Sequence, residues 1–500
     1  MNQNALSSFR SAFKRDWEEI VDYLLLVAVL GLPYYFTIER LTSRDTGFPF
    51  YLPNLYRDLT DTNPLYIVLP LCLAYWALVT LFVLRRKDAT GKKIPPVFAF
   101  IFAAYVVFKV ISVFSFPYGN APFSFDFRGN TYDVVYPGFT PEQRFTELFH
   151  ALSLAYGLLA AFSYGNSFHS YSARVMFHMV MWYFIVYALV LIFWSFFNEG
   201  SKFSNNFRAL FDSNYGIDTS IKSLTGQRNV FGFKILLGLV AVSYLCYDHP
   251  HWAYFLLMGF FLVVNLLIFS RTSFYIDIAL FLQFLLCSVF TSVRKKNRPY
   301  FLFTLSSLIL FFLIVLAVLI ANGVSPSFHE ALARNFAAMT DGSTMNARKN
   351  LRDYALSIFS AYPQFALFGY GVLPYKVLLH LFHVSAHAAE DLLHAHCGLI
   401  DVLVKEGVLG TLLFSCLYAY LFYQCWALFK KRGQVLGLYL MGTIVLLLVY
   451  CFIEPRMMFT LQTDSAYMSF VYFLGVEHAL CRYGLYDHPE EICLSRKKAV

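Results

Sequence analysis

Residues 300–321 read YFLFTLSSLILFFLIVLAVLIA, a run of 22 residues that contains no charged side chain. About 20 apolar residues in an α-helix cover the roughly 30 Å thickness of the hydrocarbon core of a bilayer. A run of this length and composition therefore predicts a membrane-spanning helix.

The whole chain of 500 residues shares this apolar character. Hydrophobic residues make up 58% of it and charged residues only 14%, with a mean hydropathy of +0.55. Soluble domains carry about 25% charged residues, and disordered chains are more polar still. The composition excludes both classes and predicts a polytopic membrane protein, with the lipid bilayer as one of its partners. The net charge of +8 comes without a long basic run or a basic-aromatic stripe, so no nucleic-acid partner is expected.

Apolar stretches of similar length recur along the sequence. We expect about twelve transmembrane helices and an all-α integral membrane fold. The first stretch lacks a small-residue cleavage site, so we expect a retained anchor rather than a cleaved signal peptide. The approximate bounds are 20–38, 65–84, 97–115, 146–164, 175–197, 230–247, 252–269, 273–291, 300–321, 408–428, 435–453 and 463–480.

Lysine and arginine are denser on one side of these stretches. The positive-inside rule places the basic clusters on the cytoplasmic face, which gives an N-in and C-in topology. The chain then divides into transmembrane helices (1–321), a large loop on the outer face (322–407), and transmembrane helices with a cytoplasmic tail (408–500). The main basic clusters are Arg85, Arg86 and Lys87; Arg294, Lys295 and Lys296; and Lys430, Lys431 and Arg432.

The loop 322–407 is the longest of the expected outside loops and holds six of the 13 histidines. Loops of this length within compact proteins are usually functional. Apolar residues at helical spacing predict one helix that begins at Asn346 as its N-cap and a second helix over about 387–405. On the second helix, His396 shares a face with Leu399 and Leu403. We expect a helical layer on the outer membrane face.

Three histidines of this loop, His380, His383 and His387, share one face of a helix. This spacing is compatible with a transition metal. Because no second ligand cluster accompanies them, we interpret them as a polar face near lipid head groups. No metal and no other cofactor is expected.

Four ionisable residues lie near the outer ends of the expected helices. Intramembrane charges usually pair or line a cavity, although each residue taken alone is also compatible with snorkelling to the interface. Their shared side favours a polar cavity that opens outward beneath the loop. These residues are Lys234, Asp277, Glu147 and Asp464.

Three short elements together resemble the O-antigen ligases and related O-antigen polymerases. The first is Ser270-Arg271-Thr272 at the start of an expected helix. The second is a run from Arg348 through Pro363 to Gly369 and Gly371. The third is His396 followed by Gly407 and Gly410, with Cys397 where the family has Asn, Ser or Gln. The stretch from Gly226 to Asn229 also looks like a family element. The resemblance covers residues 226–425, approximately the second half of the chain.

The resemblance implies a fold similar to the C-type glycosyltransferases and an activity on the periplasmic face of the bacterial inner membrane. The implied reaction moves a glycan from undecaprenyl diphosphate to a sugar hydroxyl, with inversion and without a metal. For a ligase the acceptor is lipid A–core, and for a polymerase it is another repeat unit. Other polysaccharide-assembly proteins are the further partners that this role implies.

The implied chemistry assigns roles to residues of the matching elements. Negative charge grows on the leaving diphosphate, and guanidinium groups stabilise it through paired N–H donors. We assign Arg271 and Arg348 to the diphosphate and His396 as the general base. His394, with Glu390 one turn before it, is the competing base. The further candidates for substrate binding are Arg352, Arg228, Asn229 and Lys234.

Structural interpretations stay open beside these roles. Arg271 is also compatible with an interfacial anchor, Arg348 with a solvated helix face, and His396 with an interior histidine. At the level of function, a polymerase acting on the same donor is the first alternative. A lipid-linked glycan flippase or another transporter is the second, although no internal repeat of the kind common in transporters is visible.

Overall fold

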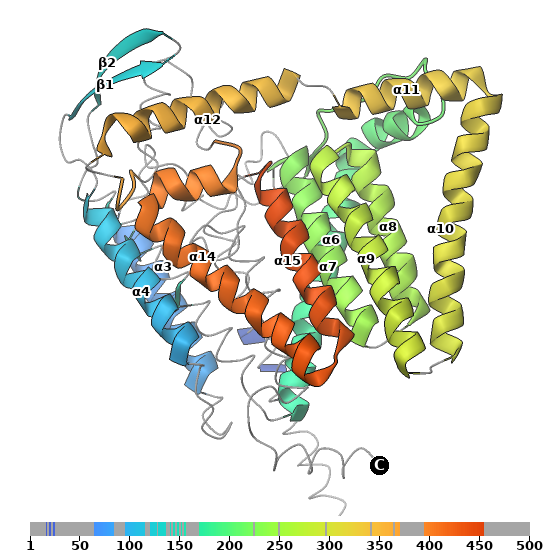
Figure 1. The fold of residues 1–500 in the computed structure, drawn as a ribbon, viewed down its shortest axis with the longest axis horizontal. Coiled ribbons are helices and arrows are strands. Elements are labelled where there is room, and N and C mark those ends of the chain that lie inside the picture. Colours follow the sequence, from blue (N-terminus) through green and yellow to red (C-terminus); the bar gives the residue numbers. More distant parts are fainter. Residues whose placement is uncertain are drawn as a thin grey trace, which may run out of the picture.

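The computed structural model describes most of the helical part of the chain (Figure 1). The described residues are 65–84, 96–115, 121–127, 129–136, 170–223, 226–248, 251–295, 298–340, 343–363, 366–370 and 395–454, with single positions within 17–25 and 141–156. The helices are α3 (Leu65–Leu84), α4 (Pro96–Ser115), α6 (Ser170–Ala209), α7 (Arg228–Asp248), α8 (Trp252–Ile268), α9 (Arg271–Lys295), α10 (Arg298–Val324), α11 (Pro326–Thr340), α12 (Ser343–Ala361), α14 (Gly398–Arg432) and α15 (Val435–Cys451).

The expected apolar stretches form helices wherever the structure describes them as a whole. By length and hydropathy, four helices of the described part can cross a membrane, and they run over Met181–Ala209, Arg228–Tyr247, Arg271–Arg294 and Thr304–Val324. The predominantly helical class is therefore confirmed, while the twelve spans and their orientation stay predictions. The expected stretches at 20–38, 146–164 and 463–480 lie mostly or wholly outside the described residues.

The upright helices surround α7. This helix packs against α6, α8 and α9, and α15 in turn packs against α9 and α14. Most of the α7 span is buried, whereas α10 stands at the edge of the bundle with almost all of its span exposed. Both helices are apolar on all sides, which suits a buried core helix in one case and a lipid-facing helix in the other.

Two helices lie across one end of the bundle. In Figure 1, α11 and α12 run roughly perpendicular to the upright helices. We call this the α11/α12 end. Helix α12 begins at Ser343, so the prediction that Asn346 is its N-cap is wrong by one turn. A helix end is set by capping and by the preceding turn, and apolar periodicity locates it only to within a few residues.

A β-hairpin that the sequence analysis did not predict packs on α12. Strands β1 (Ala121–Phe127) and β2 (Asn130–Tyr136) pair antiparallel. The rings of Phe125 and Phe127 meet the ring of Tyr354 edge-on, with both centroids at 5.4 Å. Burial raises the pKa of the Tyr354 phenol, which therefore stays neutral in this apolar contact. The hairpin and α12 thus share a small hydrophobic core outside the bundle.

A second, very short hairpin precedes α7. Strands β3 (Lys222–Ser223) and β4 (Gly226–Gln227) pair antiparallel, and the chain then enters α7 at Arg228. This connection brings Arg228 and Asn229 to the α11/α12 end of the bundle.

Candidate functional site

His396 lies in a turn immediately before α14. Its φ angle is 48°, in the left-handed region that residues other than glycine rarely adopt, and α14 begins after Cys397. The prediction that His396 belongs to a helix over 387–405 and shares a face with Leu399 is therefore wrong. The Asp401 carboxylate accepts a hydrogen bond of 2.9 Å from the Ala395 backbone N–H. This contact folds the turn back over the first turn of the helix, which a periodicity argument cannot foresee.

The backbone at Gly369 lies in direct contact with the backbone at Gly407. Gly407 breaks α14 with φ 69° and ψ −172°, and Gly369 has φ 77°. Hydrogen bonds of 2.8 to 3.2 Å join the backbone of residues 366–370 to that of 404–409. A Cβ atom on Gly407 would lie 2.5 Å from the Gly369 nitrogen, and one on Gly369 would lie 2.4 Å from the Lys405 carbonyl oxygen. Two of the sequence elements that suggested the family thus form one joint.

We expect Gly407→Ala to lower the free energy of unfolding by about 2 kcal/mol or more, because it adds a Cβ both to a left-handed residue and to a backbone crossing. Thermal unfolding in detergent measures the change. Gly259→Ala is the matched control, since Gly259 lies within α8 and a Cβ there meets nothing within 4 Å. Equal stability of the Gly407→Ala and Gly259→Ala proteins would contradict the role of the joint.

Arg352 ties the His396 turn to the end of α15. Its guanidinium donates to the carbonyl oxygens of Ala395 at 3.4 Å, His396 at 2.8 Å and Phe452 at 3.0 Å. The residue expected to bind substrate thus has a structural task, because it fixes the backbone on which the imidazole is carried.

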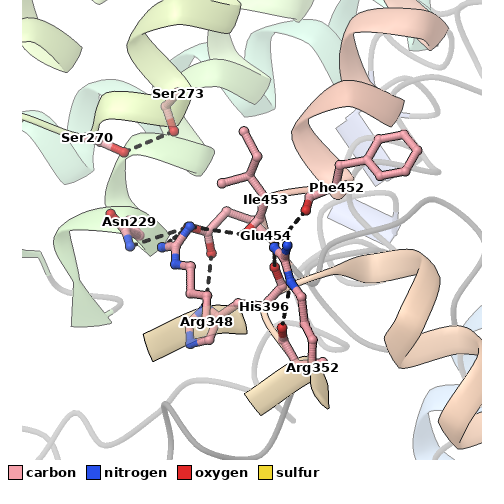
Figure 2. A network of polar contacts seen from close by, with 10 residues as sticks. Asn229, Ser270, Ser273, Arg348, Arg352, His396, Phe452, Ile453 and Glu454 are labelled. Atoms are coloured by element: carbon pink, nitrogen blue, oxygen red, sulfur yellow. Dashed lines mark hydrogen bonds and ion pairs between the residues drawn. The ribbon is translucent and has the colours of Figure 1, made fainter. Parts of the chain in front are cut away.

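The centre of the site is a carboxylate that the sequence analysis missed. Glu454 is 4% exposed, and its Oε1 accepts from Arg348 at 2.8 Å and lies 3.4 Å from the Asn229 amide nitrogen. Its Oε2 lies 3.9 Å from Nδ1 of His396, and Arg348 also donates to the Ile453 carbonyl at 3.1 Å. Figure 2 shows these side chains converging from α7, α12, the His396 turn and the end of α15.

Glu454 belongs to none of the motifs that predicted the other site residues. It follows the apolar run of α15 directly, 58 residues after His396 in the sequence. The available signal was its position, since an acidic residue at the end of an expected membrane helix faces either an interface or a partner.

Arg271 occupies the first position of α9. The preceding turn is tight, because Phe269 ends α8 in the left-handed region with φ 56° and Gly232 of α7 packs directly against Ser270. The Arg271 guanidinium donates to the Ala338 carbonyl of α11 at 2.9 Å. The structure thus places Arg271 between the bundle and the helices that lie across its end.

Positive charge exceeds negative charge among the described side chains here. Arg228 lies close enough to Arg271, Arg348 and Glu454 to feel their charges, and it makes no hydrogen bond to any residue that the structure describes. Two further guanidinium groups and one carboxylate thus act on Arg228, and like charges held together are costly unless an anion joins them.

Not every expected site residue joins this group. Lys234 is buried within α7, about 9 Å along the helix axis from Arg228, with its ammonium 6.0 Å from the centroid of the Phe233 ring. Asp277 is fully buried between helices instead of lining an open cavity with Lys234. His394, Glu390, Glu147, Asp464 and the three histidines 380, 383 and 387 lie outside the described residues.

The described residues contain no group of three or more His, Cys, Asp or Glu side chains that could hold a metal ion. The polar groups that converge on Glu454 are instead donors to anions: guanidinium groups, an amide and an imidazole. No protein-family model, curated protein or solved structure matches this chain. The chemistry of the site is therefore inferred from the arrangement of its own side chains.

Proposed function

We propose that the protein is a membrane glycosyltransferase that moves a glycan from undecaprenyl diphosphate to a sugar hydroxyl on the periplasmic face of the inner membrane. The observation that carries the proposal is the buried pair of Arg348 and Glu454, with His396 beside it and with Arg228 within electrostatic range of Arg271, Arg348 and Glu454. A diphosphate is the anion whose charge and oxygen geometry match several guanidinium groups.

Different residues act on the leaving group and on the nucleophile. The acceptor oxygen attacks the anomeric carbon, the bond from that carbon to the diphosphate oxygen breaks, and the electron pair leaves with the diphosphate. Arg271 and Arg348 stabilise the charge that develops on the leaving group. His396 accepts the proton of the acceptor hydroxyl. Direct displacement inverts the anomeric centre.

Glu454 supports both halves of this reaction. Its Oε2 is 3.9 Å from His396 Nδ1, which is longer than a hydrogen bond but close enough to stabilise an imidazolium once the proton has been transferred. Its Oε1 pairs with Arg348 and holds that guanidinium in place before the donor arrives. A carboxylate that supports a histidine base recurs in catalytic triads.

Ligation to lipid A–core and polymerisation of repeat units share this donor chemistry. We favour the ligase, because the histidine–glycine element of the sequence resembles the ligases more. Lipopolysaccharide from a deletion strain separates the two. Loss of all O-chain with long glycan left on the carrier lipid supports ligation, whereas core that carries a single repeat unit supports polymerisation. Loss of O-chain with lipid-linked precursor held on the cytoplasmic side indicates a flippase and contradicts the proposal.

We expect Arg271→Lys to lower the transfer rate at least about tenfold, roughly 1.4 kcal/mol of transition-state stabilisation. Lysine keeps the charge but loses the planar set of donors that grips two phosphate oxygens. The measurement is transfer from extracted lipid-linked glycan. Arg208→Lys, near the end of α6, is the matched control and should leave the rate unchanged. A normal rate for Arg271→Lys would remove Arg271 from the diphosphate site.

A further inference from the structure

A carboxyl group of α9 that the proposed reaction does not use lies sealed inside the bundle. Asp277 and Asn265 of α8 are each 0% exposed. Asp277 follows Arg271 by six residues, which places it about 9 Å along the helix axis from the candidate site. Helices α7, α8 and α9 meet at this point, where Asn265 also contacts the carbonyl of Gly232 in α7.

The hydrogen bonds of Asn265 fix the direction of its amide. The side-chain nitrogen donates to the Gly232 carbonyl oxygen at 3.3 Å and to Oδ2 of Asp277. A carbonyl oxygen can only accept, so the amide must turn its nitrogen toward Gly232. Both N–H groups of the amide are then in use.

Two oxygen atoms remain without a hydrogen-bond partner. They are Oδ1 of Asp277 and Oδ1 of Asn265, and both are buried. If Asp277 is ionised, both atoms are acceptors and no donor serves either of them. A buried carboxylate with one hydrogen bond and a buried amide oxygen with none are each unfavourable.

A single proton on Asp277 would give both oxygen atoms a hydrogen-bond partner. We propose that Asp277 is a neutral carboxylic acid whose Oδ1–H donates to Oδ1 of Asn265, so that acid and amide form a closed, uncharged pair. The acid gives one O–H donor, the amide returns one N–H donor to Oδ2, and the second N–H holds Gly232. All polar atoms of the three groups are then satisfied without burying a charge.

This pair fastens three helices beneath the start of α9. Gly232 is held by its carbonyl to Asn265 and packs through its Cα against Ser270, the residue before Arg271. A neutral Asp277 also adds no negative charge below Arg228 and Arg271, so the excess of positive charge at the site remains available to an anionic ligand.

Infrared difference spectra at pH 7 test the proton directly. The wild-type protein should show the carbonyl stretch of a protonated carboxyl group, and this band should be lost in Asp277→Asn. It should remain in Asp401→Asn, because the Asp401 carboxylate accepts a backbone N–H at the His396 turn. A spectrum of Asp277→Asn that retains every protonated-carboxyl band would overturn the proposal.

Thermal unfolding in detergent tests the pairing. A side-chain amide at this position would offer the same donor and acceptor as the neutral acid, so Asp277→Asn should unfold near the wild-type temperature. Asp277→Ala leaves the Asn265 oxygen and one N–H without partners and should unfold several degrees lower. If Asp277→Asn falls as far as Asp277→Ala, the charge is required and the proposal is wrong. Neither measurement uses a substrate, so a failure of the proposed glycosyl transfer leaves both results intact.

Discussion

His396→Asn is expected to lower glycan transfer by at least about 100-fold, the lower bound usual for the loss of a general base. Asparagine tolerates the left-handed backbone that His396 adopts with φ 48°, whereas alanine would add strain there. The contact from Arg352 reaches the carbonyl of His396 rather than its ring, so the substitution leaves this link in place. The rate is measured on extracted lipid-linked glycan, with the amount of protein in the membrane determined in parallel.

His329→Asn is the matched control for this substitution. His329 lies in α11, and its ring hydrogen-bonds Asn322 at 3.0 Å, away from the contacts that surround Glu454. We expect this variant to keep the wild-type rate. Full activity of His396→Asn would remove the base from the mechanism and leave His394 as the next histidine to test.

The helices of the bundle could be predicted because a backbone in lipid must satisfy its hydrogen bonds within the helix. The run at 65–84 is α3, and the run expected at 435–453 is α15, which ends at Cys451. Composition is therefore enough to predict which segments are helical, because each of these runs is apolar enough to form a helix whatever its position in the bundle.

The hairpin of β1 and β2 shows where composition stops being sufficient. Phe123, Phe125 and Phe127 alternate with polar residues, which is the pattern of a half-buried strand. The strands are short, however, and a two-stranded hairpin is stable only against a second surface. That surface is α12, more than 200 residues away in the sequence, so local signals could not establish the hairpin.

The candidate site was predictable in its residue types and not in its geometry. Arg348 and His396 were assigned together, and the structure brings both to Glu454. The conformation of His396 depends on the Asp401 carboxylate and on Arg352, which are tertiary contacts. Glu454 was missed for the same reason, since its meaning lies in the partners that the fold brings to it.

Arg348→Ala is expected to have two separate effects. The pair of Arg348 and Glu454 is buried, with 11% and 5% of the side chains exposed. Removing the guanidinium leaves a buried carboxylate without its main partner, which should lower the free energy of unfolding by about 3–5 kcal/mol. It should also lower the transfer rate by about 100-fold or more, because a donor to the developing charge of the leaving group is lost.

The double substitution Arg348→Ala with Glu454→Ala separates the two effects. Removing both partners leaves no uncompensated charge, so most of the lost stability should return in thermal unfolding. The transfer rate should stay low, because the leaving group still lacks the Arg348 guanidinium. If the double variant regains activity together with stability, Arg348 acts only to neutralise Glu454, and the diphosphate depends on Arg228 and Arg271 alone. If stability does not return, the buried pair is not what holds α12 against the end of α15.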